Sequence, residues 1–307
     1  MQKTYINALY ELMLRDERVC SLLSDSGTEY GLFLARDFPD RVFNFGIAEQ
    51  NKVGASAGMA ALGKIPFVYT TGACLAYRAY EFIRDDICMQ NRNVKLVGMG
   101  AGLLGSTLGA THHTTEDLAA LRSLPRLTLL NAATPLQLAQ MVQAAYEIKG
   151  PVYIRIGMSG ETELYPAEYR LSAAGVDTLQ VGTPYVLFGT GALMGEIMRA
   201  AQRLESEGIS AQVVNVFRMK PLDSEAILRA CEGKKAIVTI EEHNILGGLG
   251  SAIAEVLSGH GIGIPLYRIG LKDTFASGYG KASEVRAQNH LDADGIYRQI
   301  KEQIEKR

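Results

Sequence analysis

Glu49 is the ionisable residue whose surroundings point most directly to chemistry. It lies in the segment RVFNFGIAEQNKVGASAGMAALGK, at the point where a strand pattern gives way to a helix pattern. Gly54, Gly58 and Ala61 help to give that helix a face of small side chains, which permits close packing. An acid in the first turn of a helix is already favoured by the helix dipole. The local sequence therefore leaves two interpretations of Glu49, a helix-capping acid and a buried catalytic carboxyl.

Several other polar residues are candidates for a site. Asp25 follows the first strand pattern in LLSDSG, where an aspartate also commonly caps a turn. His112 and His113 lie together in LGATHHTTED, and His243 lies in EEHN near the end of a later strand pattern. A single histidine is more often structural than catalytic, and we expect His243 to be structural.

Three glycine clusters follow predicted strands and superficially resemble nucleotide-binding loops. None combines GxGxxG with a ribose-binding acid in a convincing register, so tight strand-to-helix turns are the better interpretation. The sequence contains no GxxxxGK[ST] or HExxH motif, which excludes the common P-loop and zinc-protease patterns. The clusters are Gly98, Gly100, Gly102 and Gly105; Gly189, Gly191 and Gly195; and Gly247, Gly248 and Gly250.

The elements that position these residues alternate between short apolar strands and longer helical patterns. VCSLLSD, RVFNFG, PFVYT, VKLVGMG, LTLLNAA and PVYIRIG read as strands, and YVLFGTG, SAQVVNVF, KAIVTIEE and IPLYRIG continue the series. Such alternation predicts an α/β fold of two domains, each a mostly parallel sheet flanked by helices. The rhythm is lost between residues 158 and 183, so we expect a first domain over 1–165, a linker over 166–182 and a second domain over 183–307.

The composition of the sequence limits the kinds of partner that the protein can bind. The 307 residues carry 31 Lys+Arg against 33 Asp+Glu, a formal net charge of −2, which provides no electrostatic excess for nucleic acid or an anionic membrane. No apolar run approaches the roughly 20 residues that span a bilayer, and the acidic N-terminal helix pattern is unlike a signal peptide. The four cysteines form no CxxC pair and sit in apolar settings, which favours reduced thiols and a cytoplasmic location.

The order and spacing of several motifs resemble the transketolase family. FNFGIAEQN, KIPFVYTT, RAYEFIRDDI, GAGLLGSTLGATHHTTEDLAALRSLP and PVYIRIG are similar to the pyrimidine-binding domain of transketolases. The segment from VLFGTGALMGEIMRAAQ through EEHNILGGLGSAIAEVL resembles the transketolase C-terminal domain, so the resemblance covers essentially the whole chain. The family's first domain, whose GDG…N motif binds Mg²⁺ and the cofactor diphosphate, has no counterpart. The chain therefore looks like the C-terminal subunit of a two-chain transketolase.

This resemblance implies a cofactor, a partner and several residue roles. Thiamine diphosphate would bind with its aminopyrimidine nitrogen N1′ against Glu49, and Asp25 matches an aspartate near the cofactor. Burial under an apolar helix face would raise the pKa of Glu49 towards the operating range. His112 matches the GxTH histidine beside the reacting groups of the substrate. An N-terminal subunit would supply the diphosphate and Mg²⁺ site, in a dimer of heterodimers that acts on small ketoses and aldehydes.

The chain departs from the family where the cofactor ring and the substrate would lie. The aromatic expected about eight residues after Pro66 falls on Cys74 with Leu75 beside it, although Tyr77 aligns with a further ring contact.

Three polar substrate contacts are also replaced. Gly100 stands for a histidine, Leu108 for the aspartate that reads a sugar hydroxyl, and Met158 for the arginine that clamps a phosphate. A phosphate buried without partners is strongly disfavoured. We therefore expect a less polar or unphosphorylated substrate, or clamp residues from the missing subunit.

Three functions remain compatible with the sequence. The first is a ketol-transferring transketolase subunit. The second is a thiamine-dependent subunit that forms or cleaves α-hydroxyketones from 2-oxo acids, similar to the beta subunits of 2-oxo-acid dehydrogenases. The third is a non-catalytic scaffold subunit, which the retained sequence around Glu49 argues against.

Overall fold

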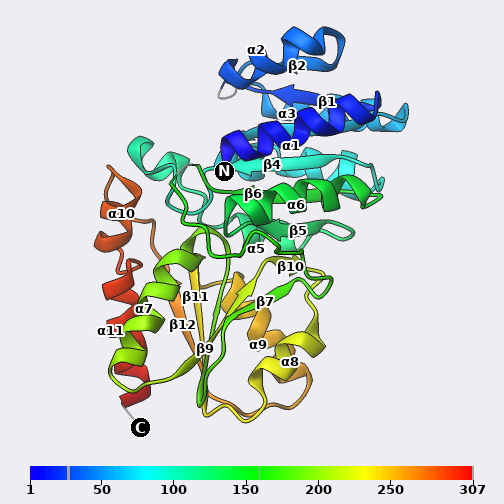
Figure 1. The fold of residues 1–307 in the computed structure, drawn as a ribbon. Helices are drawn as coiled ribbons and strands as arrows, with labels where there is room; N and C mark the ends of the chain where they lie inside the picture. Colours follow the sequence, from blue (N-terminus) through cyan, green and yellow to red (C-terminus); the bar gives the residue numbers. More distant parts are fainter. Residues whose placement is uncertain (26–27, 159, 306–307) are drawn as a thin grey trace.

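The computed structural model describes residues 1–25, 28–158 and 160–305, and it divides them between two sheets that each have helices on both faces (Figure 1). Most strand pairings in both sheets are parallel. This arrangement confirms the predicted fold class of two α/β domains.

The first sheet has the strand order β10-β5-β6-β4-β3-β1-β2 among the described residues, and only β10 runs antiparallel to its neighbour. Every side chain of β1, β4 and β6 is buried, because helices cover the sheet on both faces. The strands are β1 (Val19–Leu23), β2 (Val42–Asn44), β3 (Ile65–Thr71), β4 (Lys95–Met99), β5 (Thr128–Asn131), β6 (Val152–Ile156) and β10 (Arg218–Lys220).

Helices α1 (Gln2–Arg15), α2 (Thr28–Asp37) and α6 (Pro135–Glu147) pack on one face of this sheet, with α1 and α6 side by side (Figure 1). The other face is covered by α3 (Glu49–Ala61), α5 (Asp117–Arg122) and the segment from Cys74 to Cys88. That segment is a short α-helix, α4 (Tyr80–Phe82), between two π-helical turns, η3 (Cys74–Arg78) and η4 (Ile83–Cys88).

The second sheet has the order β12-β11-β8-β9-β7 in the described part of the chain, with only β7 antiparallel. Its strands are β7 (Val176–Gln180), β8 (Tyr185–Gly189), β9 (Ala211–Val216), β11 (Ala236–Asn244) and β12 (Leu266–Leu271). Helices α7 (Met194–Ser206) and α11 (Ala293–Glu305) pack on one face, and α8 (Ser224–Cys231) and α9 (Leu249–Gly259) on the other; α10 (Ala282–Gln288) precedes α11.

The two domains share elements at their junction. β7 belongs to the second sheet although it lies within residues 166–182, which the sequence suggests as a linker. β10 follows the second domain's β9 along the chain but pairs with β5 of the first sheet, Arg218 opposite Leu130. One hydrophobic cluster contains residues of α3 and η4 as well as residues of α8 and α9, so the apolar core is continuous across the junction.

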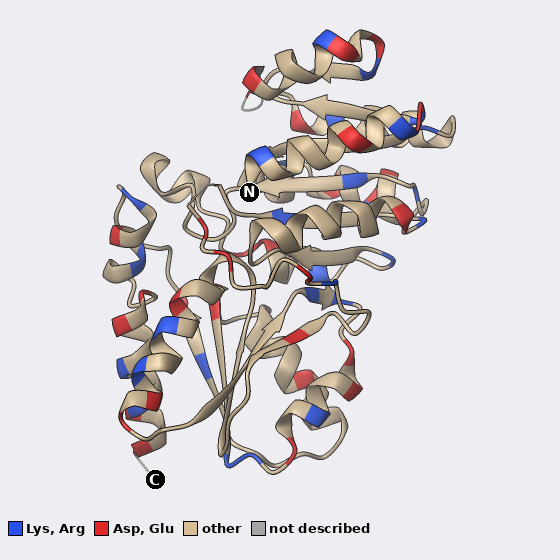
Figure 2. Cartoon of the chain, viewed as in Figure 1, with Lys and Arg blue, Asp and Glu red and all other residues tan. Residues whose placement is uncertain are grey.

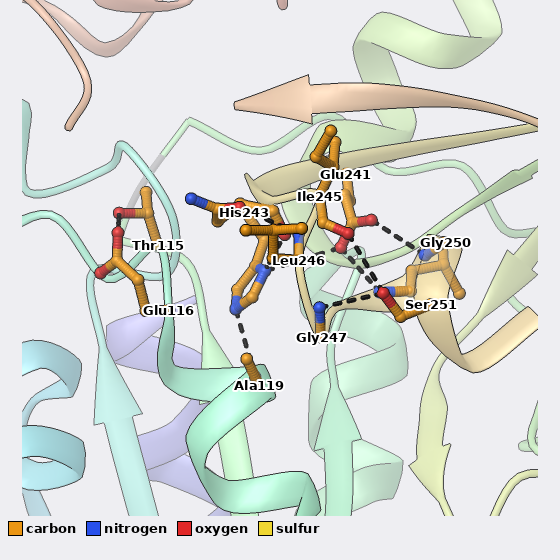
Figure 3. A network of polar contacts seen from close by, with 12 residues as sticks. Thr115, Glu116, Ala119, Glu241, His243, Ile245, Leu246, Gly247, Gly250 and Ser251 are labelled. Carbon is orange, nitrogen blue, oxygen red and sulfur yellow. Dashed lines mark hydrogen bonds and ion pairs between the residues drawn. The ribbon is translucent and has the colours of Figure 1, made fainter. Parts of the chain in front are cut away.

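Polar contacts reinforce this junction around the end of β11 (Figure 3). The backbone N–H of Asn244 donates to the Thr115 carbonyl at 2.7 Å, and the N–H of Ala119 donates to Nε2 of His243 at 3.3 Å. His243 Nδ1 lies 2.6 Å from the Asn244 carbonyl, so it carries the proton and donates there. His243 thus joins the two domains, in agreement with the structural role expected for it.

Charged residues of both signs are spread over both domains (Figure 2). In the described residues no helix is both long and apolar enough to span a bilayer.

Candidate active site

The candidate residues gather where the parallel strands of the first sheet end. Ser24 follows β1, Gly100 follows β4, Met158 lies just beyond β6, and Glu49 is the first residue of α3, which follows β2. Ligands of open α/β sheets commonly bind in the crevice outside these carboxyl ends. The topology therefore brings together residues that are far apart in the sequence.

Glu49 is a buried carboxylate that accepts hydrogen bonds from three residues in other parts of the chain. Its side chain is only 3% exposed. Oε1 accepts hydrogen bonds from Ser24 Oγ at 3.3 Å and from Thr70 Oγ1 at 3.4 Å, whereas Oε2 accepts from Nη1 of Arg78 at 2.5 Å. Arg78 is the outermost of these partners, since its side chain is 44% exposed. Contacts with Ser24, Thr70 and Arg78 go beyond what a helix-capping acid requires.

The pKa of Glu49 is shifted in the opposite direction to the one expected from the sequence. Burial raises the pKa of Glu49, but the hydrogen bond from Arg78, the backbone N–H of Glu49 and the charges of Arg78 and Lys52 together lower it below its ordinary value. The expected upward shift is therefore wrong for this chain by itself. The sequence argument considered burial alone, and the cation that reverses the sign lies 29 residues further along the chain.

The three residues expected near the cofactor ring are placed differently. Cys74 is half-buried at the start of η3, and burial raises its thiol pKa. Leu75 is fully buried in the core and offers no exposed surface to a ring. Tyr77 is partly exposed, and its hydroxyl both donates to Oε2 of Glu116 and accepts from the Glu116 N–H, each at 2.9 Å. Of the three, Cys74 and Tyr77 have exposed side-chain surface, and Cys74 is close enough to Glu49 and Arg78 for their charges to act on its thiol.

Residues 100–114 form a loop whose ends are joined, because Gly102 pairs with Thr114 and Thr114 Oγ1 donates to the Gly100 carbonyl at 3.2 Å. Gly100 has φ +78°, and a Cβ built there would lie 4.0 Å from Met158 Sδ. The structure thus brings Gly100 and Met158 close together, while their role at the substrate stays a prediction. A side chain at Gly100 would be strained by its positive φ.

The same loop carries the substrate candidates Leu108 and His112. Leu108 is exposed at the end of the 3₁₀ turn η5 (Ser106–Leu108), and His112 is half-buried at the end of η6 (Ala110–His112), its Nδ1 3.0 Å from Thr111 Oγ1. His113 is buried, and neither ring nitrogen has a hydrogen-bond partner among the described residues. Burial lowers the pKa of His113. Its unsatisfied nitrogens are a feature that the sequence pattern did not reveal.

Asp25 lies at the exposed end of β1, one residue after Ser24. Its role near the cofactor stays a prediction. Lys52 was not anticipated as part of the site at all. It is fully buried one turn after Glu49, and its Nζ donates to Ser24 Oγ and to the Tyr69 carbonyl at 3.0 Å.

Family comparisons identify both halves of the chain. The family model for the transketolase pyrimidine-binding domain matches residues 1–159, and the model for the transketolase C-terminal domain matches residues 174–296. The chain belongs to the transketolase family.

The similar transketolases include separate subunits. A putative transketolase C-terminal section of Methanocaldococcus jannaschii is 35% identical and aligns with 100% of this chain and 96% of its own length. One of the subunits of an apulose-4-phosphate transketolase from Actinobacillus succinogenes is 36% identical over 85% of this chain and 84% of its own length. A 6-deoxy-6-sulfo-D-fructose transketolase subunit of Clostridium sp. strain MSTE9 is 31% identical over 100% of this chain and 95% of its own length.

A solved structure shows the same architecture. A split-gene transketolase, described as an inactive beta4 tetramer, is 37% identical, covers 98% of this chain and 97% of its own, and superposes with a TM-score of 0.89. The chain is thus of the same type as the C-terminal subunits of split transketolases. It is a transferase subunit of the thiamine-diphosphate-dependent family.

Proposed function

We propose that this chain is the C-terminal subunit of a two-chain transketolase that transfers a two-carbon ketol unit from a ketose donor to an aldehyde acceptor. The buried Glu49 carboxylate carries this proposal. It lies at the carboxyl end of the first sheet, and one of its oxygens accepts a hydrogen bond from the partly exposed Arg78.

The residues around Glu49 fit the aminopyrimidine of thiamine diphosphate in part. Glu49 offers a carboxylate to a ring nitrogen, and Cys74, Tyr77 and Asp25 are the candidate flanking residues. The bound cofactor would supply a carbanion that attacks the donor carbonyl. The family's diphosphate and metal motif is missing from this sequence, so we assign the diphosphate and Mg²⁺ mainly to the partner.

Within this proposal, the chain's own side chains hold a proton and orient the substrate. Glu49 exchanges a proton with the ring nitrogen, and Ser24 and Thr70 fix its inner oxygen. His112 contacts the reacting hydroxyl and carbonyl groups of the substrate. Gly100, Leu108 and Met158 line the rest of the substrate site without offering a side-chain hydrogen bond.

The partner is an N-terminal transketolase subunit. The relatives named as subunits and the inactive beta4 assembly of a similar chain support this assignment, since both suggest that the C-terminal half works with a second chain. We infer a magnesium-containing dimer of heterodimers. The four cysteines, all unpaired, support a cytoplasmic location.

The donor is a non-standard ketose. Relatives named for apulose 4-phosphate and for 6-deoxy-6-sulfo-D-fructose support a family branch with altered sugar recognition. Replacement of the phosphate-clamping arginine by Met158 points in the same direction. An unphosphorylated tail, or a clamp residue from the partner, is compatible with this site.

The experiment is to co-express the chain with an N-terminal subunit that carries GDG…N and to measure ketol transfer from a panel of ketoses and 2-oxo acids. We expect transfer from a ketose that depends on thiamine diphosphate. Glu49→Gln should keep the fold and the assembly but lower kcat at least about 100-fold, because the amide cannot exchange a proton. Near-normal turnover of this variant would indicate that Glu49 only caps the helix. Release of CO₂ from 2-oxo acids, without transfer from any ketose, would favour the decarboxylating alternative.

A further inference from the structure

Lys52 is a buried cation that no role described so far uses. It lies on α3, and its side chain is 0% exposed. A charge removed from water is strongly unfavourable unless it is paired and hydrogen-bonded. The ammonium group has two such partners, Ser24 Oγ and the Tyr69 carbonyl. A methionine or leucine would fill the same space without the desolvation penalty, so the charge itself calls for an explanation.

Ser24 connects this cation to Glu49 in a defined direction. A hydroxyl has one proton to donate, and its oxygen can accept others. The ammonium of Lys52 can only donate, so Ser24 Oγ accepts from it and directs its own proton to Oε1 of Glu49, 3.3 Å away. The result is a chain of donors that runs from Lys52 through Ser24 to the inner oxygen of the carboxylate.

Few charged groups lie around the hydrogen bonds that connect Lys52, Ser24 and Glu49. Arg78 and Cys74 on η3 face the same cluster as Lys52 and Glu49, and Ser24 and Thr70 are its neutral members. On the opposite packing surface of α3, Asp86 of η4 approaches Gly54. Lys52 is therefore the only cation on the buried side of Glu49 among these groups, whereas Arg78 lies on the outer side.

We propose that Lys52 is a positioning residue that, through Ser24, stabilises the ionised form of Glu49 and so favours the state in which the proton shared with the cofactor lies on the ring nitrogen. The inference rests on the proposed function of Glu49. Burial lowers the pKa of Lys52 to about 8, partly opposed by Glu49. Lys52 is thus charged near neutral pH, and a cation so close to a carboxyl lowers that carboxyl's pKa.

The primary test reads the Glu49 carboxyl directly in the full chain without cofactor. Infrared difference spectra on acidification contain a carboxylic-acid band that is absent from Glu49→Gln. We expect this band to titrate about one pH unit or more higher in Lys52→Met than in the unmodified chain. Ser24→Ala should shift it in the same direction, and Ser24→Thr, which keeps the hydroxyl, should restore it. Lys64→Met, which removes an exposed lysine just after α3, is the matched control and should leave it unchanged.

In the assembled enzyme, Lys52→Met and Ser24→Ala should lower kcat by roughly tenfold or more while KM changes little. If Lys52→Met fails to fold, the carboxyl titration of Ser24→Ala tests the proposal. An unshifted carboxyl titration in the folded variants would overturn the proposal. The titration does not depend on turnover, so this failure is distinct from the failure of Glu49 as a catalytic group, which the activity of Glu49→Gln reports.

Discussion

At the scale of single residues, we expect Met158 to control which donors the proposed substrate site binds. Its Sδ lies beside Gly100, at the edge of the loop that carries His112. A charge-assisted hydrogen bond is worth about 1.5–3 kcal/mol. We therefore expect Met158→Arg to raise the kcat/KM for phosphorylated ketoses by about 10-fold to 100-fold relative to the native donor. Kinetics of the assembled enzyme on paired phosphorylated and unphosphorylated donors measure this ratio.

Two variants serve as controls for this change. Met158→Leu alters the side chain without adding charge, and Met89→Arg adds a charge at an exposed position outside the site. Neither should change the ratio. Efficient use of xylulose 5-phosphate by the unmodified enzyme would contradict an unphosphorylated donor and would assign the phosphate clamp to the partner. A companion Gly100→His change is less informative, because the φ of +78° at Gly100 strains any side chain there.

The site residues differ in how far the sequence could predict them. Glu49 and His112 stand in recognisable motifs, so their positions followed from the resemblance. The lowered pKa of Glu49 did not, since it depends on Arg78 reaching back from another element. Lys52 carried a visible signal, a lysine on a helix whose neighbours include Gly54 and Ala55. Its importance appears only once β1 places Ser24 between the two charges.

At the scale of elements, the parallel strands were the predictable part and the antiparallel ones were not. β1, β4 and β6 are mostly apolar and are buried at every residue, a pattern typical of strands covered on both faces. β7 and β10 are short, partly exposed segments whose strand character comes from their pairing with β9 and β5. Pairing with a distant strand leaves no periodic signal in such short sequences.

The end of β11 also holds a carboxyl with a testable pH response (Figure 3). Glu241 accepts hydrogen bonds from the N–H groups of Leu249 at 2.7 Å and Gly250 at 2.9 Å, at the start of α9. Burial raises its pKa to about 7, although these donors and Arg155 and Arg268 oppose the shift. A raised folded-state pKa means that its stabilisation is full below the unfolded-state pKa and is lost as the pH rises through about 7.

We therefore expect Glu241→Gln to remove this pH dependence. The unfolding free energy of the unmodified chain minus that of the variant should fall by about 2 kcal/mol between pH 5 and pH 8. Urea unfolding at both pH values measures the difference. Glu232→Gln, at an exposed carboxylate just after α8, is the control and should follow the unmodified chain. Parallel pH profiles for Glu241→Gln would show that Glu241 does not take up a proton on folding.

At the scale of the whole molecule, the chain presents Glu49 beside apolar surface. Ile47, two residues before Glu49, is 75% exposed, and Phe43 on β2 is also exposed. A partner that holds the diphosphate must approach Glu49 closely enough for one cofactor to contact both chains. We therefore place part of the partner interface at Ile47 and Phe43.

This arrangement predicts where cofactor affinity comes from. Charge-assisted contacts to the diphosphate and its metal supply most of the binding free energy, so calorimetry should show weak binding of thiamine diphosphate to this chain alone and tight, magnesium-dependent binding to the complex. Ile47→Lys should weaken both subunit association and cofactor binding at least about tenfold, because it loses an apolar contact worth about 1.5–3 kcal/mol and adds a charge to be desolvated. Val181→Lys, at an 83% exposed valine between β7 and β8, is the matched control and should have no effect. Tight, magnesium-dependent binding to the isolated chain would contradict the split-enzyme assignment, whereas unchanged association of Ile47→Lys would move the interface elsewhere on the first domain.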